Sequence, residues 1–462
     1  MAISDDRQSP DARSGDVTER PPAEEGEDPT SDVERGGEAS ADDAATAERS
    51  LRRTLSEHRV HAAVVVAMGL YPPLYQLLIS TPLGAEFAVV LPPVRTMVAV
   101  LYVGLFAMSF DFISGYTGYL SFGHSLFYGT GAYLVVLAAT GKLPGLSAGT
   151  PFMGLLLLGG ILAALIALLV GTVSFRLTGV YFAMITLGFA EVAHVFIRNW
   201  DHVSPSPQDG ANIGGDVGAF QIGVPGVDTL SVGIGRLVGD SYENLFGTGI
   251  EFNEAMVSFY AVGAVVLVSY FAMQRIVHSP FGRVMIAIRE NEERARAIGY
   301  DTYRFKLVAF AISGFFAAVA GALFAGFRRS VGPSSTFDLF VTADALLAAI
   351  IGGFGTLAGA LYGHLFHEFL GGILSTESHG LSRYLRENLP PDLLNAEVAG
   401  VPLLDVVNVL IDGRAELYLG LVFVLFVLYV PKGILGTIRD RIGGTAAEHL
   451  PGHVRKYFRD RR

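Results

Sequence analysis

Apolar runs, most of them about 20 residues long, recur along the chain and limit its possible folds more than any other feature. They lie at residues 60–80, 94–113, 117–139, 152–174, 179–198, 255–273, 307–328, 341–352, 356–374 and 417–431. A helix of about 20 apolar residues crosses a hydrocarbon layer roughly 30 Å thick. Only 17% of the residues are charged, against about 25% in a soluble globular protein. The sequence therefore predicts an all-α fold, a polytopic membrane helical bundle with about ten transmembrane segments.

The runs 341–352 and 356–374 form the least regular part of this pattern. Together they are too long for one crossing, and the sequence Gly352-Gly353-Phe354-Gly355-Thr356 between them is typical of a tight turn between two helices. The first run is short, so a re-entrant segment buried in protein is an alternative to two crossings.

Basic residues predict the orientation, because an excess of Lys and Arg marks the cytoplasmic side. They gather before the first run, between residues 275 and 306, and at the C-terminus, whereas residues 200–254 hold eight acidic residues and one base, Arg236. We therefore expect both termini and the 275–306 loop to be cytoplasmic, and the loops 200–254 and 375–416 to be external. Two ends on one side require an even number of crossings, which agrees with ten.

The net charge of −11 lies almost entirely in the first 50 residues, where 15 acidic residues face five arginines. A segment so acidic and so poor in large apolar residues is predicted to be disordered. The predicted organisation is an acidic disordered cytoplasmic tail (1–57), a transmembrane permease domain (58–438) and a basic cytoplasmic tail (439–462). Binding of a basic partner by the acidic tail is a less favoured alternative to simple solvation.

One charged segment interrupts the apolar pattern, Ser279–Lys306, with the sequence SPFGRVMIAIRENEERARAIGYDTYRFK. Ser279 suits a helix N-cap and Pro280 the first helical position. Gly299 suits a left-handed helix end. We expect a short helix between them, with Met285, Ile288, Ala295 and Ile298 as its apolar members. Such a helix on the cytoplasmic side is suited to docking with a soluble partner, which suggests a subunit powered by another protein.

A second motif, Gly115–Tyr133, mixes glycines with hydroxyl side chains inside an apolar region. Small residues allow close helix packing, and hydroxyl groups can line a polar route. Spacing alone favours plain packing, and the tyrosines of the motif favour a lined cavity. The candidate translocation residues in it are Gly118, Ser121, Gly123, His124 and Thr130.

Ionisable residues in or near the predicted spans are a third candidate group, because a charge in hydrocarbon is costly and usually faces water or the bundle interior. They are His124, Glu191, His194, Asp344, His364, His367 and Glu368. A solute cavity or a satisfied internal pair explains them better than a proton relay or a metal site on His364 and His367, which lacks a third ligand at a suitable spacing. Of these, Glu191 and Asp344 join the candidate translocation path.

Several chemistries are excluded by the motifs. The Gly141-Lys142 pair is followed by leucine and lacks the glycine spacing of a phosphate-binding loop. The absence of cysteine excludes disulfides and thiol catalysis. We expect no catalytic residues, cofactor, bound metal or nucleic-acid partner. Energy from ATP would have to come from another polypeptide.

The chain resembles the permease subunits of ATP-binding-cassette importers for branched-chain amino acids, the Liv-type permeases, and specifically their M-type. The resemblance rests on Gly118–Tyr133, Val180–Ile197, Ser279–Leu323, Ile350–Gly363 and the closing sequence PKGILG at Pro431–Gly436. It covers nearly all of residues 60–440, and its most specific part is Ser279–Leu323.

This resemblance implies a multi-pass protein of the cell membrane that works with partners. They are a second, related permease, two ATPase subunits and an external solute-binding protein. It also implies that the cytoplasmic segment couples the permease to the ATPases. The implied docking residues are Arg289, Glu290, Asn291, Glu292, Ala295 and Gly299.

The solute is predicted less closely than the role. Branched-chain or other small amino acids are the first expectation, and urea, short amides and sugars are alternatives within the same family. A rival from another class is a secondary transporter that couples ions through Glu191, His194 and Asp344, but it leaves the charged segment unexplained. A membrane-embedded enzyme lacks any convergent acid, base or metal group.

Overall fold

The computed structural model describes residues 59–82, 84–146, 150–213, 231–233, 236–238, 254–374, 397–398, 401–402, 415–430 and 433–437. The predicted tails 1–57 and 439–462 lie outside these residues, as do most of the predicted loops 200–254 and 375–416. The chain divides into two compact units, residues 1–67 and 68–462. Of the first unit, only the start of helix α2 (Arg59–Ile79) is described.

Among the described residues, six helical segments are long and apolar enough to cross a membrane. They are α4 (Val94–Thr117), α6 (Phe152–Ser174), α7 (Val180–Arg198), α8 (Glu254–Val277), α11 (Thr302–Arg328) and the segment Leu417–Thr437 around α17 (Ala415–Tyr429). A seventh candidate is the bent pair α12 (Leu339–Gly352) and α13 (Leu357–Leu374). The protein is therefore a multi-pass helical membrane protein, whereas the ten crossings and the cytoplasmic ends stay predictions.

The remaining elements are short. The helices are α3 (Gly84–Val90), α5 (Ser125–Ala139), η1 (Pro207–Asp209), α9 (Pro280–Glu290) and α10 (Glu292–Ala297). The strands form antiparallel pairs: β1 (Ala211–Asn212) with β4 (Ser330–Val331), β2 (Ser231–Gly233) with β3 (Arg236–Val238), and β5 (Glu397–Val398) with β6 (Val401–Pro402). In β1 and β4, Ala211 lies opposite Val331 and Asn212 opposite Ser330.

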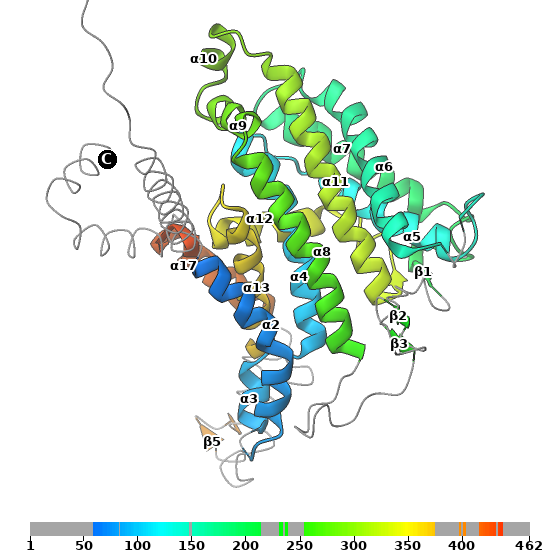
Figure 1. Ribbon diagram of the computed structural model, residues 1–462, viewed down its shortest axis with the longest axis vertical. Helices are drawn as coiled ribbons and strands as arrows, with labels where there is room; N and C mark the ends of the chain where they lie inside the picture. The colour runs from blue at the N-terminus through cyan, green and yellow to red at the C-terminus, as the bar shows by residue number, and fades with distance from the viewer. Residues whose placement is uncertain are drawn as a thin grey trace, which may run out of the picture. The chain divides into compact units, whose positions relative to one another are not determined.

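The centre of the bundle is formed by α4 and α11. The apolar stretches of these two helices are 83% and 78% buried, compared with 33–44% for α6, α7 and α8. Helices α5 and α6 pack on one side of α11, whereas α12 and α13 pack against α4 (Figure 1). The outward faces of α6 and α7 are rich in exposed leucine, valine and isoleucine, as expected for helices that meet lipid or another membrane subunit.

The contact between α5 and α11 explains part of the glycine-rich motif. A Cβ atom on Gly321 of α11 would lie 1.9 Å from the backbone oxygen of Tyr128, and one on Gly131 of α5 would lie 1.9 Å from that of Ala318. Both positions therefore need glycine so that the two backbones can meet. Close helix packing, the interpretation that spacing alone favours, accounts for Gly131.

Two predicted helix boundaries are wrong. The run 117–139 is not one helix, because α4 continues to Thr117 and ends where Gly118 takes a left-handed conformation (φ 79°). Residues 118–124 are not α-helical, and α5 begins only at Ser125.

The predicted helix between Ser279 and Gly299 is two helices. Ser279 caps α9 and Pro280 opens it, as predicted, but the chain becomes extended at Asn291 (φ −164°, ψ 102°) before α10 begins. Gly299 does take a left-handed conformation (φ 97°). Ile298 is not an apolar packing residue, since it is 70% exposed.

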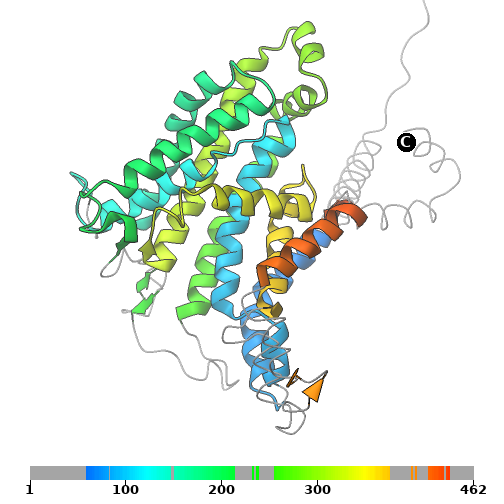
Figure 2. The ribbon, with the colours of Figure 1, turned by 180° about the vertical axis from the view of Figure 1, so that it is seen from behind.

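The turn predicted at residues 352–356 is confirmed. Helix α12 ends at Gly352, α13 begins at Leu357, and their axes differ by 106°. Figure 2 shows α12 running across the bundle and α13 turning to run along it. A broken span and a re-entrant loop both fit this bend.

Gly321→Ala should destabilise the protein by about 1–3 kcal/mol, because the added methyl group forces α5 and α11 apart. The measurement is the thermal unfolding midpoint of the purified protein in detergent. Gly154→Ala in α6 is the matched control, since nothing lies within 4 Å of a Cβ at that position. Equal midpoints for the two variants would contradict the tight crossing.

Candidate functional site

Helices α9 and α10 lie together at one end of the bundle, beyond α8 and α11 (Figure 1). They share a small apolar core of Val284, Ile288 and Ala295, against which Phe305 of α11 packs. Phe281 of α9 also stacks on the Phe305 ring, with ring centroids 5.3 Å apart. This charged segment is therefore a folded part of the bundle rather than a free loop.

Asn291 forms the joint between the two helices. Its backbone N–H closes α9 by binding Ala287 O, and its side-chain oxygen accepts from Arg294 N at 2.8 Å, which caps α10. Asn favours such caps because its side chain competes with helical backbone hydrogen bonds. One residue thus ends one helix and starts the next.

Glu292, the first residue of α10, connects this joint to the bundle. Its Oε2 accepts a hydrogen bond from Tyr119 Oη at 2.6 Å. Its Oε1 accepts from Lys306 Nζ at 2.8 Å and from Thr302 Oγ1 and Arg296 Nη2 at 3.0 Å each. We call these five residues the Glu292 clamp. The clamp joins α10, the start of α11 and the connection between α4 and α5.

Lys306 is the buried cation of the clamp. Its side chain is only 4% exposed, compared with 19% for Glu292. Lys306 Nζ also donates to Tyr119 Oη at 2.9 Å, and it lies 4.5 Å from the centre of the Tyr119 ring. Because a buried charge is costly unless it is paired and hydrogen-bonded, this ammonium group strongly favours the conformation in which Glu292 faces inward.

The clamp shifts the pKa values of its two acids in opposite directions. Burial acts to raise the pKa of Glu292, but hydrogen bonds from Lys306 and Tyr119 outweigh burial, so the pKa lies below its usual value. Burial and the Glu292 carboxylate together raise the pKa of Tyr119. Glu292 is therefore a carboxylate and Tyr119 a neutral donor at neutral pH.

Arg289, at the end of α9, makes a second attachment. Its Nη1 donates to Gly115 O in the last turn of α4 at 2.5 Å. Nearby, Asp111 Oδ1 accepts from Gly355 N in the α12–α13 turn at 2.8 Å. Gly355 has φ 82°, and a Cβ atom there would lie 2.7 Å from Arg289 Nη1. Arg289 thus fits between the end of α4 and the turn of the bent pair.

The predicted docking residues therefore divide into two groups. The side chains of Arg289, Glu292 and Ala295 are used in contacts within the chain, and Asn291 caps α10. Glu290 and Gly299 are exposed. The outward surface also includes Glu293, Arg294, Ile298 and Tyr300. We call these last six residues the outer face of the charged segment.

The predicted translocation residues of the glycine-rich motif are mostly inside the bundle. His124 is fully buried, and its Nε2 lies 3.1 Å from Ser109 Oγ and 3.4 Å from Ser313 Oγ. Ser121 is also buried. Thr130 bonds back to Leu126 O within α5, Gly123 packs against the backbone of Thr186, and Gly118 lies beside Arg289.

The other predicted residues do not converge on His124. Glu191 is 58% exposed and lies 3.7 Å from His194 on α7, whereas Asp344 is exposed on α12. The rings of His364 and His367 stack with their centroids 6.0 Å apart, and His364 Nε2 lies 3.9 Å from Glu368. Within the described residues, no three His, Asp or Glu side chains are placed to hold a metal ion.

Sequence reasoning missed the roles of Lys306, Tyr119 and Asp111. In the sequence, Lys306 is one of the basic residues that indicate orientation, and Tyr119 is one of the tyrosines that favour a lined cavity. Asp111 lies inside the predicted run 94–113, where any ionisable residue signals a functional or structural site, so that signal could have found it.

Comparisons with known proteins identify the family of the chain. The protein-family model described as "Branched-chain amino acid transport system / permease component" matches residues 93–374. The high-affinity branched-chain amino acid transport system permease protein LivM of Escherichia coli K12 is 28% identical over 341 residues, which are 73% of this chain and 68% of that protein. LivM of Salmonella typhimurium is 31% identical over 255 residues, 54% of this chain and 56% of that protein.

More distant relatives have other names. The autoinducer 2 import system permease protein LsrC of Photorhabdus laumondii is 33% identical over 111 residues, 23% of this chain and 33% of that protein. No solved structure matches the chain. The chain thus spans only part of each of these relatives, and all three are transport permeases rather than enzymes.

Lys306→Met should loosen α10, because it removes the buried ammonium group from the Glu292 carboxylate and leaves only the exposed Arg296 as its cation. Loss of a hydrogen bond to a charged group costs about 1.5–3 kcal/mol, so trypsin cleavage after Arg294 and Arg296 should accelerate about tenfold or more. The control is Glu293→Gln, which removes the neighbouring exposed carboxylate and should leave the rate unchanged.

The same trypsin assay should depend on pH, because the pKa of Glu292 is lowered in the fold. The stabilisation that the clamp gives should be complete above the usual pKa of glutamate and should be lost as the pH falls through the lowered value.

Proposed function

The chain belongs to the branched-chain amino acid transport system permease family, and from this premise we propose that it is a membrane-spanning subunit of an ATP-binding-cassette importer. The solutes we propose are branched-chain or other small amino acids. They would be delivered by an external binding protein to a permease pair that rests on two ATPase subunits.

The observation that carries this proposal is the attachment of the charged segment. Glu292 and Arg289 hold its inner side against α11 and α4, with Arg289 beside the α12–α13 turn, while its outer face remains exposed. A force applied to the outer face would therefore reach the two most buried helices directly. Docking of an ATPase at this face would give ATP-driven closure a mechanical route into the bundle.

The clamp supports movement of the segment and α11 as one body. Four hydrogen bonds converge on one carboxylate, whereas Asn291 and Gly299 bracket α10 with non-helical backbone. We propose that α9, α10 and the first turns of α11 move together, and that this rocking opens the translocation path past Ser121 and His124 alternately to each side.

Orientation completes the proposal. The cluster of seven basic residues between 275 and 306 supports a cytoplasmic position for the charged segment. We propose the same side for both chain ends, with ten crossings in between. The opposite end, with β1 and β4, then faces outward, where the binding protein would dock.

Uptake should depend on ATP hydrolysis and not on ion gradients. In liposomes that contain the complete transporter and internal ATP, solute should accumulate in the presence of ionophores and stop when a non-hydrolysable ATP analogue replaces ATP. The alternative, a secondary transporter that couples ions through Glu191, His194 and Asp344, predicts the reverse. Accumulation by the purified chain alone would contradict the proposal.

Ile298→Asp should reduce co-purification of the ATPase subunits while membrane insertion continues. An isoleucine buried at an interface contributes about 1.5–3 kcal/mol, so affinity should fall at least tenfold. Ile298→Met is the matched control, because it keeps an apolar side chain of similar volume. Undiminished co-purification of the Asp variant would exclude the outer face as the docking surface.

Arg289→Glu should abolish uptake without reducing the amount of protein in the membrane, because a carboxylate would replace the donor to Gly115 O and face Asp111. The measurement is initial uptake rate per amount of inserted protein. Arg304→Glu is the control, since Arg304 is an exposed residue at the same end that pairs with Asp301 at 3.0 Å. Normal transport by the Arg289 variant would show that this attachment does not carry the coupling.

A further inference from the structure

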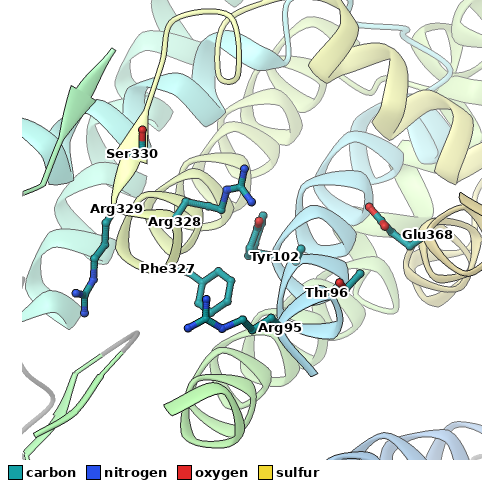
Figure 3. A pocket seen from close by; sticks show the side chains of 9 residues that line it. Arg95, Thr96, Tyr102, Phe327, Arg328, Arg329, Ser330 and Glu368 are labelled. Atoms are coloured by element: carbon teal, nitrogen blue, oxygen red, sulfur yellow. The ribbon is translucent and has the colours of Figure 1, made fainter. Parts of the chain in front are cut away.

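A pocket of about 670 Å³ opens at the end of the bundle opposite the charged segment. It lies among the start of α4, the end of α11 and α13 (Figure 3). The polar lining residues are Arg95, Thr96, Tyr102, Arg328, Arg329, Ser330 and Glu368, and the apolar ones are Ala99 and Phe327. Ligand pockets commonly have volumes of about 300–1,000 Å³.

The charges in this pocket are unbalanced. Three arginines but only one acidic residue, Glu368, belong to its lining. Within the described part of the chain, Arg95, Arg328 and Arg329 have neither an ion pair nor a side-chain hydrogen bond, whereas Arg289 and Arg304 at the other end do. An anionic group that entered the pocket could therefore accept hydrogen bonds from these guanidinium groups, because no carboxylate of the described chain accepts them.

The pocket is also built around a fixed backbone feature. Arg329 is the only described non-glycine residue with a positive φ, 57°. Its N–H binds Ala325 O at 3.0 Å and its C=O accepts from Ile213 N at 2.7 Å. A left-handed conformation costs energy for a residue with a side chain, and here the β1–β4 pairing holds it. The consecutive Arg328 and Arg329 side chains thereby point in different directions, Arg328 toward Tyr102 and Arg329 away from it (Figure 3).

Opposite charges lie on different walls. In Figure 3 the guanidinium groups extend from α4 and α11, and Glu368 approaches from α13 beyond Tyr102. Glu368 is 34% exposed, and Phe327 and Ala99 add apolar surface to the lining. A carboxylate matches the guanidinium groups, an ammonium group matches Glu368, and an aliphatic side chain matches the apolar surface.

We propose that this pocket is an outer entry site for the zwitterion of a small amino acid, with the carboxylate at Arg95 and Arg328 and the ammonium group at Glu368. The proposal rests on the proposed function for the outward orientation of this end and for the solute class. Charges at the mouth of the bundle stay partly hydrated and so cost less than charges in hydrocarbon. The pocket thus supplies the carboxylate site that the interior residues around His124 lack.

The test is protection of the arginines from phenylglyoxal, a reagent for guanidinium groups, in the assembled transporter in phosphatidylcholine nanodiscs without binding protein or ATP. With l-leucine as the probe, modification of Arg95 and Arg328, read by peptide mass spectrometry, should slow about twofold at the dissociation constant and about tenfold at ten times that concentration. Leucinamide, which lacks the carboxylate, should not protect. Arg198, exposed at the end of α7, is the internal control and should react at one rate throughout.

Glu368→Gln gives a second arm. In this variant l-leucine and N-acetyl-leucine should protect equally, whereas the unmodified chain should favour l-leucine, because only that solute offers an ammonium group to Glu368.

The proposal would be overturned if protection of the arginines by l-leucine did not saturate with concentration, or if l-leucine protected Arg198 equally. If added phosphatidylglycerol alone blocks modification and leucine adds nothing, the pocket binds lipid headgroups and the proposal is also wrong. ATP-driven uptake is measured separately in liposomes, and an assembly that does not take up solute contradicts the proposed function. An assembly that takes up solute although l-leucine does not protect Arg95 and Arg328 contradicts only the entry site.

Discussion

A buried ion pair between Glu292 and Lys306 determines how the charged segment of this permease is held. Lys306 cannot easily stay in the bundle without a carboxylate, and α10 provides one only if it lies flat against the start of α11. The orientation of the outer face follows from this pairing, because residues that follow Glu292 in a short helix have fixed directions. Arg289 then adds a separate attachment to α4 and to the α12–α13 turn. The segment is therefore positioned by two contacts of different chemistry, one ionic and one with a backbone carbonyl.

Helix α11 links this attachment to the far end of the molecule. Its 27 residues correspond to a length of about 40 Å, with Lys306 near the first turn and Arg328 at the last residue. Along its length it packs against α4, α5 and α6, and Gly321 brings it into backbone contact with α5. A displacement at the clamp is thus passed to a closely packed helix rather than to a flexible connection, which suits a transporter whose motor is a separate protein.

The sequence predicts the positions of the helices better than it predicts the contacts between their side chains. The runs 152–174 and 356–374 match α6 and α13 within one residue, because long apolar stretches and glycine turns are local signals. The sequence does not predict the break at Asn291, since a surface helix tolerates a single Asn although Asn favours caps, and only the backbone conformation distinguishes the two. The inward direction of Glu292 was missed because its partners Tyr119 and Lys306 are distant in sequence, Tyr119 by 173 residues. The six arginines and acidic residues of the pocket and clamp can be recognised as charged residues in the sequence. Which of them lie close together depends on how three or four helices pack, and the sequence does not show this.

The short pairing of β1 with β4 has a consequence for signalling across the membrane. Residues 211–213 belong to the segment that follows α7, yet they are hydrogen-bonded to the chain directly after α11. A protein that binds the segment after α7 and displaces it must either break these few hydrogen bonds or move the C-terminal end of α11 as well. In the proposed orientation, the β1–β4 pair would therefore act on α11 from outside and the clamp would act on it from inside, so that solute delivery and ATP turnover would affect the same helix.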